Sequence, residues 1–169
     1  KAPMPTDLTA DRLREVLAYD AQTGAFTWRV TQSNRAKAGN TAGSLHRQDG
    51  YVYIRVDGVL HKAHRLAWLH VHGAWPTAGV DHVNGDRGQN GIANLREASQ
   101  AQNMQNLRRP HRDNKLGFLG VMQCGSRFVG RIKAGPSYFT SEKFDTPQEA
   151  HAAYLQLKAI HHPYGAVVR

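Results

Sequence analysis

The chain has 169 residues and a formal net charge of +9, with 22 lysines and arginines against 13 acidic residues. This length allows one ordinary domain or two small ones, and the positive charge predicts a polyanionic partner, most simply nucleic acid. No apolar run is long enough to span a bilayer, so we expect no membrane-spanning segment; a basic protein of the membrane surface is the alternative. A single cysteine, Cys124, excludes an intrachain disulfide and a multi-cysteine zinc site, and it predicts a cytoplasmic protein.

The N-terminal part predicts a short helix followed by a strand. Apolar residues recur at near-helical spacing from residue 8 to residue 17, and Thr9 can cap the helix. Residues 25–30 alternate between apolar and polar, which indicates a strand. Residues 31–43 are polar and predict a loop, in which Arg35 is either solvated or a contact to a phosphate.

A β-hairpin is predicted next. Residues 51–56 alternate, Asp57-Gly58 is a type I′ turn signal, and residues 59–63 form the returning strand. A ribbon of this kind fits the major groove of DNA, where Arg55 could contact the duplex. Alternatively, the face that carries the tyrosines of residues 51–56 packs on the first helix. We favour packing for the tyrosines and leave Arg55 open.

Residues 64–73 predict a helix. Its expected apolar stripe consists of Leu66, Ala67, Trp68 and Val71. Trp68 is expected in the core rather than as a platform for stacking bases. Three histidines, His64, His70 and His72, fall on different faces of this helix and are expected to be structural or solvated. Among them His64 is the one to test, because it matches the motif HRLAW quoted below and could lie near the site.

Asp81 and His82 form the most informative pair in the chain. A carboxylate can hold a hard cation, and an imidazole can take a proton from water near neutral pH. Neighbouring side chains of a strand point to opposite faces, so the pair needs a bend to converge, which Asn84-Gly85 can supply. Residues 99–107 contain good helix formers behind a possible Ser99 cap. The prediction is therefore a hairpin, a loop and a helix.

The run HRLAW…DHVNGD…NGIANLR…SQAQNMQN resembles the HNH endonucleases of phages and mobile introns. The resemblance implies a ββα-metal (His-Me finger) core over about residues 64–107. Position by position, it implies that Asp81 and Asn103 hold one Mg²⁺ or Mn²⁺ ion, that His82 is the general base, and that Asn94 holds the hairpin loop near that base.

The last third predicts a separate unit after a basic linker at residues 108–116. Three short strands are expected at residues 120–123, 127–133 and 137–144. A helix follows, with Thr146 as its N-cap and Glu149 completing a capping box. The helix is expected to bury Ala150, Ala153, Tyr154, Leu157 and Ile160.

The pattern GV…RFVGRI…F.TPQEAHAAY of this unit resembles the APETALA-type (ethylene-response-factor-like) DNA-binding domain. That domain binds the major groove with its three-stranded sheet. The chain departs from the family pattern at Phe128, where a tryptophan is usual, and at Met122-Gln123-Cys124, where basic residues are common.

Together these features predict an α+β protein with a nuclease domain at 1–107, a linker at 108–116 and an APETALA-type domain at 117–169. We expect a metal-dependent endonuclease that nicks double-stranded DNA as a monomer, in the cytoplasm of a bacterium or a phage-infected cell. The alternative is a DNA-binding regulator without nuclease activity. The catalytic residues are predicted to be His82 and Asn94, and the metal ligands Asp81 and Asn103. The predicted contacts to DNA are Arg35, Arg55, Arg96, Arg108, Arg109, Arg112, Arg127, Arg131, Lys133 and Lys143.

Overall fold

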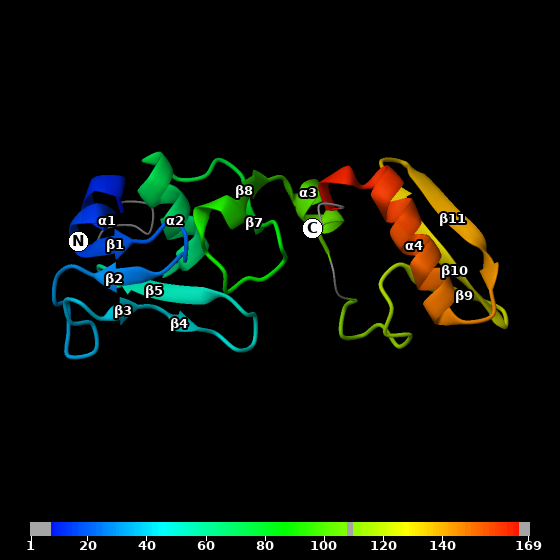
Figure 1. Cartoon of the computed structure of the whole chain (residues 1–169), viewed down its shortest axis with the longest axis horizontal. Helices are drawn as coiled ribbons and strands as arrows, with labels where there is room; N and C mark the ends of the chain where they lie inside the picture. Colours follow the sequence, from blue (N-terminus) through cyan, green and yellow to red (C-terminus); the bar gives the residue numbers. More distant parts are fainter. Residues whose placement is uncertain (1–7, 108–109, 166–169) are drawn as a thin grey trace. The chain divides into compact units, whose positions relative to one another are not determined.

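The computed structural model of the chain describes residues 8–107 and 110–165 and divides it into two compact units, Lys1–Ser99 and Gln100–Arg169 (Figure 1). Both units mix helices with small antiparallel sheets, so the α+β class predicted from the sequence is confirmed. The units are defined by compactness alone, and the functional boundaries given above stay predictions. None of the helices in the described part has the length and apolarity that a membrane span requires.

The first unit begins with the predicted helix and strand. The Thr9 side chain accepts a hydrogen bond from the Arg12 amide at 3.2 Å, which confirms Thr9 as the N-cap. A three-stranded sheet follows in the order β1-β2-β3, and its last strand forms at the end of the predicted loop. The elements are α1 (Ala10–Val16), β1 (Leu17–Tyr19), β2 (Phe26–Trp28) and β3 (Thr41–Ala42).

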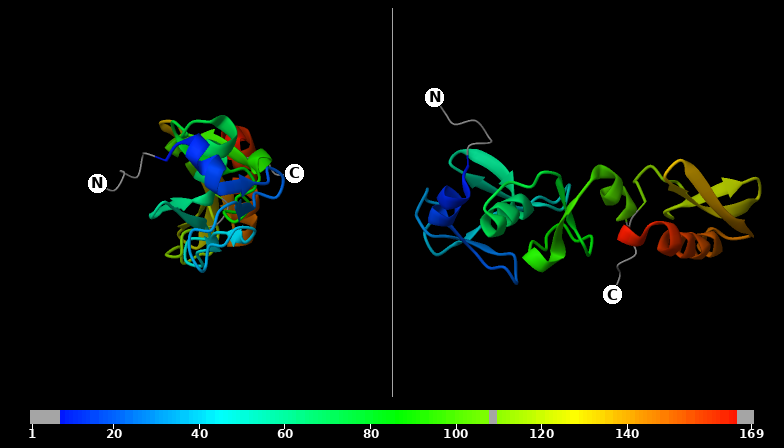
Figure 2. Two further views of the ribbon diagram at one scale, coloured as in Figure 1. Left: turned by 90° about the vertical axis from the view of Figure 1, so that its left-hand side faces the viewer. Right: turned by 90° about the horizontal axis from the view of Figure 1, so that it is seen from above.

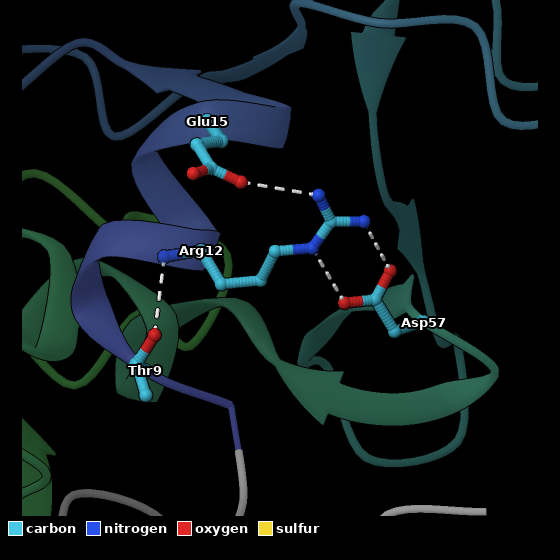
Figure 3. Close-up of polar contacts among 4 residues, drawn as sticks. All are labelled: Thr9, Arg12, Glu15 and Asp57. Atoms are coloured by element: carbon cyan, nitrogen blue, oxygen red, sulfur yellow. Dashed lines mark hydrogen bonds and ion pairs between the residues drawn. The ribbon is translucent and has the colours of Figure 1, made fainter.

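A second sheet contains the predicted hairpin and has the order β4-β5-β6, with β4 at Ser44–Leu45, β5 at Val52–Val56 and β6 at Val59–Lys62. The positive φ angles of Asp57 (46°) and Gly58 (83°) confirm the type I′ turn. Arg12 of α1 clamps this turn with two 3.0 Å hydrogen bonds to the Asp57 carboxylate (Figure 3). These bonds hold the pKa of Asp57 below its usual range and tie the first helix to the hairpin.

The predicted packing of the hairpin tyrosines on the first helix is wrong. The hairpin residues that enter the core are Ile54 and Val56, which alternate with the tyrosines along the strand. Tyr53 instead donates a 2.7 Å hydrogen bond to the Asp49 carboxylate, and Tyr51 contacts two histidine rings described below. Arg55, left open above, is exposed and donates to the Gly58 carbonyl at 2.7 Å.

Helix α2 (Ala63–His72) lies at the centre of the first unit and ends at Gly73, which has the left-handed conformation. Its Leu66 and Ala67 are fully buried as predicted, and Trp68 packs against the core from a partly buried position. Val71 is 42% exposed, so the predicted stripe is wrong there. The core joins α1, α2 and the three small sheets of the unit through Leu13, Val16, Leu17, Phe26, Ile54, Leu66, Leu69 and Val80.

The third sheet of the first unit carries the predicted motif. Strands β7 (Gly79–His82) and β8 (Leu95–Ala98) are antiparallel, and the 3-10 helix η1 (Ile92–Asn94) leads into β8. The connection spans residues 83–94, so it is a long loop rather than the tight Asn84-Gly85 hairpin suggested by the dipeptide. The two residues make only a local turn, in which the Gly85 amide donates to the His82 carbonyl at 2.9 Å.

The second unit begins with α3 (Gln100–Gln105) and contains the predicted three-stranded sheet, with strands in the order β11-β10-β9. Its strands are β9 (Val121–Cys124), β10 (Arg127–Ala134) and β11 (Ser137–Phe144). Helix α4 (Pro147–His161) lies along one face of this sheet, as Figure 2 shows, and the short helix η2 (Pro163–Gly165) follows. The capping box between Thr146 and Glu149 is formed, which confirms that prediction.

Close approach of α4 to the sheet requires glycine at position 130. A Cβ atom there would lie 2.5 Å from the Ala150 carbonyl oxygen and 2.7 Å from the Tyr154 nitrogen. Ala150 and Tyr154 are buried as predicted, but Ile160 is 70% exposed, so the last residue of the predicted stripe is wrong. The buried residue of that turn is Lys158, whose ammonium group donates to the Leu107 carbonyl.

Candidate active site

Asp81 and His82 lie at the end of β7, where the strand alternation sends their side chains to opposite faces. Asp81 is paired across the sheet with Arg96 of β8, and the Arg96 Nη2 atom lies 3.1 Å from the Asp81 Oδ2 atom. Only 21% of the arginine side chain and 14% of the aspartate side chain are exposed. Arg96 thus forms an ion pair with Asp81, and its predicted contact with DNA stays a prediction.

His82 is buried and hydrogen-bonded to a second buried side chain, Asn90. The His82 Nε2 atom lies 3.1 Å from the Asn90 Oδ1 atom, and both residues are 3% exposed. Because an amide oxygen can only accept, Nε2 carries the proton of the neutral imidazole and Nδ1 carries the lone pair. Burial lowers the pKa of His82, so the ring is neutral at neutral pH, as a general base requires.

Asn90 is itself held by the N-terminal part of the chain. The Tyr19 hydroxyl donates to the Asn90 carbonyl at 2.7 Å, and the Ile92 amide donates to the Ala21 carbonyl at 2.9 Å. Gly24 lies so close that a Cβ atom there would be 2.2 Å from the Asn90 carbonyl carbon. The turn between β1 and β2 therefore supports the loop that orients His82. Asn90 stands directly before Gly91 in the motif quoted above, but only the contact to His82 distinguishes it from the other amides of the motif.

Asn94 connects the two ends of the loop. Its Oδ1 atom accepts from the Asn84 amide at 3.0 Å, and its Nδ2 atom donates to the Gln89 carbonyl at 2.9 Å. The Asn94 carbonyl also accepts from the Val83 amide at 2.8 Å, next to His82. These are bonds that a loop-bracing residue has to make, and the catalytic role carried over from the resemblance stays a prediction.

Two further rings surround His82. The His64 ring lies edge-on to the His82 ring, with 5.0 Å between centroids, and the Tyr51 ring lies 5.1 Å from His64 and 6.1 Å from His82. His64 is 4% exposed, and burial lowers its pKa to about 3. His64 therefore lies beside His82, as its match to the motif suggested. Tyr51 could not be predicted as a neighbour of His64 and His82 from the sequence, because only the fold brings it to the histidines.

The chemistry of Asp81 fits a hard divalent cation, since carboxylate and amide oxygens are the ligands that Mg²⁺ accepts together with water. Asp81 Oδ2 is engaged by Arg96, so a cation bound there would compete with the guanidinium for the same carboxylate. Asn103 belongs to α3 of the second unit, and its pairing with Asp81 stays a prediction. Over residues 8–107 and 110–165, no three His, Cys, Asp or Glu side chains gather in a way that could hold a metal.

The predicted DNA contacts outside the motif differ in their surroundings. Arg35 is exposed in the loop before β3. Arg112 is exposed and lies 3.8 Å from Asp113. Arg108 and Arg109 lie outside the described residues.

The last four predicted DNA contacts, Arg127, Arg131, Lys133 and Lys143, lie on the sheet of the second unit. Arg131 of β10 packs on the Tyr138 ring of β11, 4.0 Å from its centroid, with Lys133 at 5.6 Å from the same centroid. Arg127 pairs with Asp145 at 2.9 Å, and Lys143 is exposed. Since α4 covers the opposite face of the sheet, these side chains form a basic surface on the face that the helix leaves uncovered.

Comparison with known proteins gives one match. No curated protein and no solved structure matches the chain. Residues 61–105, which include α2, β7, the loop, β8 and α3, match the family model of the HNH endonucleases. Nucleases of this kind are DNA-cleaving hydrolases that generally use a divalent metal ion. The match therefore supports an HNH nuclease that acts on DNA, with Asp81, His82, Asn94 and Asn103 all inside the matched segment.

Proposed function

We propose that the protein is a metal-dependent endonuclease that hydrolyses phosphodiester bonds in double-stranded DNA. The observation that carries the proposal is the buried, neutral His82 beside Asp81, inside the segment that matches the HNH endonucleases. Asp81 and Asn103 are the proposed ligands of a Mg²⁺ or Mn²⁺ ion, which when bound stabilises charge on the reacting phosphate and on the leaving oxygen.

His82 is the proposed general base. Its Nδ1 atom takes a proton from water, the water oxygen bonds to phosphorus, and the 3′ oxygen leaves with the electron pair of the broken bond and takes a proton from solvent water. The products are a 5′ phosphate and a 3′ hydroxyl. Asn90 keeps the proton of the neutral His82 ring on Nε2, so that Nδ1 can accept a proton. Asn94 holds the loop that carries Asn90.

The second unit is the proposed DNA-binding partner of this site, as an APETALA-type domain at residues 117–169 behind a linker at 108–116. Support comes from the three-stranded sheet that α4 covers on one face only, with Arg131 and Lys133 on the basic side. One chain supplies one site, so a monomer is expected to nick a duplex. We place this activity in the cytoplasm of a bacterium or phage-infected cell.

A DNA-binding regulator without nuclease activity is the second candidate. The ion pair between Arg96 and Asp81 favours it, because the arginine occupies the carboxylate that the metal needs. The two candidates are separated by whether a divalent ion displaces Arg96 from Asp81.

Incubation of the full chain with supercoiled plasmid tests the proposal. We expect open-circular DNA in Mg²⁺ or Mn²⁺, appearing before any linear form, and intact plasmid in EDTA. Binding without cleavage under all three conditions would support the regulator instead. Linear DNA with no preceding open circle would contradict nicking by a monomer.

A further inference from the structure

Two cationic side chains meet on one aromatic ring beside His82. The Lys62 ammonium lies 3.9 Å from the centroid of the Tyr51 ring, and the Arg87 guanidinium carbon lies 4.9 Å from the same centroid. Lys62 ends β6, whereas Arg87 lies in the loop between β7 and β8, so the fold brings them together from separate elements. The Tyr51 centroid is 6.1 Å from the His82 centroid, so the ring that both cations contact lies near the proposed general base.

The two cations are not neutralised within the described residues, where neither forms an ion pair with a carboxylate. The nearby Asp49 carboxylate accepts instead from Tyr53, at 2.7 Å, and from the Tyr51 amide, at 3.1 Å. Asp86, next to Arg87 in the chain, accepts from Gly88 and Gln89 at 2.9 and 3.0 Å. Asp49 and Asp86 therefore hydrogen-bond to other groups, and among the described residues Lys62 and Arg87 share one ring without an ion pair to either of them.

The loop also fixes the direction of Arg87. Its Nη1 atom donates to the Asp49 carbonyl at 3.0 Å, which uses one of the five N–H donors of a guanidinium. The remaining fork can bind a phosphate through two parallel hydrogen bonds, and Lys62 can act as a compact charge on a phosphate oxygen. Cations held in place on an aromatic ring lose less freedom when an anion binds than cations on free side chains do.

We propose that Lys62 and Arg87, seated on Tyr51, form a binding site for a phosphate of the DNA strand next to the bond that is cut. The site would hold the substrate backbone beside His82, and Tyr51 is its positioning residue. This inference rests on the proposed function, because it requires DNA to enter the site of His82.

The test compares full-length Lys62→Gln, Arg87→Gln and the double variant with wild type. Loss of this one phosphate contact should reduce the slope of log affinity against log salt by about 0.9 in the double variant, and by part of that in each single variant. Binding is measured on a duplex in EDTA, where no cleavage occurs. In Mg²⁺ or Mn²⁺ we expect the KM for nicking to rise by about tenfold in the double variant, with a smaller change in kcat.

Arg65→Gln is the matched control. Arg65 lies in the same unit and also packs on a ring, 5.6 Å from the centroid of Trp75, and that ring stacks with His61. Its loss removes one charge and one cation–π contact, so the salt slope and KM should stay at wild-type values. Tyr51→Leu removes the ring on which both cations rest, so its salt slope and KM should shift in the same direction as those of the double variant.

The outcomes separate this inference from the function on which it rests. If the wild type cuts DNA but the folded double variant keeps the wild-type salt slope and KM, the phosphate site is refuted and the nuclease stands. Equal losses in Arg65→Gln and Arg87→Gln would also refute it, because charge alone would then explain the effect. If the wild type neither binds nor cuts DNA, the proposed function itself fails.

Discussion

The two units offer two kinds of polar surface. Around His82 the polar groups are buried and fixed by one another, as in the pairs His82–Asn90 and Asp81–Arg96. On the sheet of the second unit, Lys133 and Lys143 are exposed, and Arg131 rests on an exposed tyrosine. Proton transfer requires groups held within fractions of an ångström, whereas attraction to a phosphate backbone tolerates movement. We therefore expect substitutions in the first region to act steeply on cleavage and those in the second to act gradually on affinity.

The largest effect is expected from Asp81→Ala. Loss of the carboxylate removes a proposed metal ligand, so the nicking rate should fall by about 10⁴-fold or more, corresponding to several kcal/mol of transition-state stabilisation. DNA affinity in EDTA should stay within about threefold of wild type, because basic side chains supply most of it. Asp11→Ala, which removes a carboxylate that is 93% exposed on α1, is the control. Wild-type nicking by Asp81→Ala would show that the ligand is another residue.

His82→Ala should reduce the nicking rate by about 10³-fold, within the range found for a lost general base. The comparison is sharpened by His72→Ala, which removes an exposed histidine from α2 and should cut at the wild-type rate. Both variants are measured on supercoiled plasmid at saturating protein. If they lose activity equally, His82 has no special role and the buried region does not differ from the surface in the way described.

Asn90→Ala should slow nicking by about 10²-fold, because His82 Nε2 loses the acceptor that sets its proton and its orientation. The buried imidazole is also left with an unpaired donor, which should cost about 1–3 kcal/mol of unfolding free energy. Denaturant unfolding and nicking measured on the same preparation separate the two effects. A variant as active as wild type would mean that the loop orients His82 without Asn90.

Acid should destabilise the first unit through His64. The pKa of His64 is about 3 in the folded protein and about 6.5 when unfolded, so the unfolded state binds more protons between these values. Stability is therefore complete above pH 6.5 and falls as the pH falls, by about 2 kcal/mol between pH 8 and pH 5 from this residue. His64→Leu should flatten the dependence of the unfolding free energy on pH. Part of the pH dependence should remain in this variant, because burial also lowers the pKa values of His61, His70 and His82. An unchanged slope in His64→Leu would contradict the assignment.

The smallest effects are expected on the sheet of the second unit. Lys133→Gln and Arg131→Gln should each weaken DNA binding only a few-fold and lower the salt slope by about 0.9, with nearly additive effects. The rate of nicking at saturating protein should not change. A loss of that rate comparable with Asn90→Ala would erase the distinction between the two regions.

Local features of the fold could be predicted from the sequence because their causes are local. The Thr9 cap, the Asp57-Gly58 turn and the capping box at Thr146 each depend on residues a few positions apart. The predicted burial of Val71 and Ile160 is wrong, because periodicity shows which residues share a helix face but not where the surface that covers this face ends. That limit is set by tertiary packing.

The candidate site likewise contains residues that a local motif identifies and residues that only tertiary packing brings in. Asp81, His82 and Asn94 stand in one short motif and could be named from the sequence. Asn90 could not be ranked above Asn94 without the contact to His82. Tyr51 lies directly before β5, far from Asp81 and His82 in the sequence, and only the packing of β5 beside α2 brings it to the histidines.

The most direct test of the central claim is the chemistry of the nick itself. Wild type and Asp81→Ala are purified in parallel, incubated with supercoiled plasmid in Mg²⁺ or Mn²⁺, and the open-circular product is treated with DNA ligase. Hydrolysis that leaves a 5′ phosphate and a 3′ hydroxyl predicts that ligase reseals the wild-type nicks, that EDTA prevents them, and that Asp81→Ala makes none. Nicks that ligase cannot reseal, nicks that persist in EDTA, or equal nicking by Asp81→Ala would contradict a metal-dependent nuclease site at Asp81 and His82.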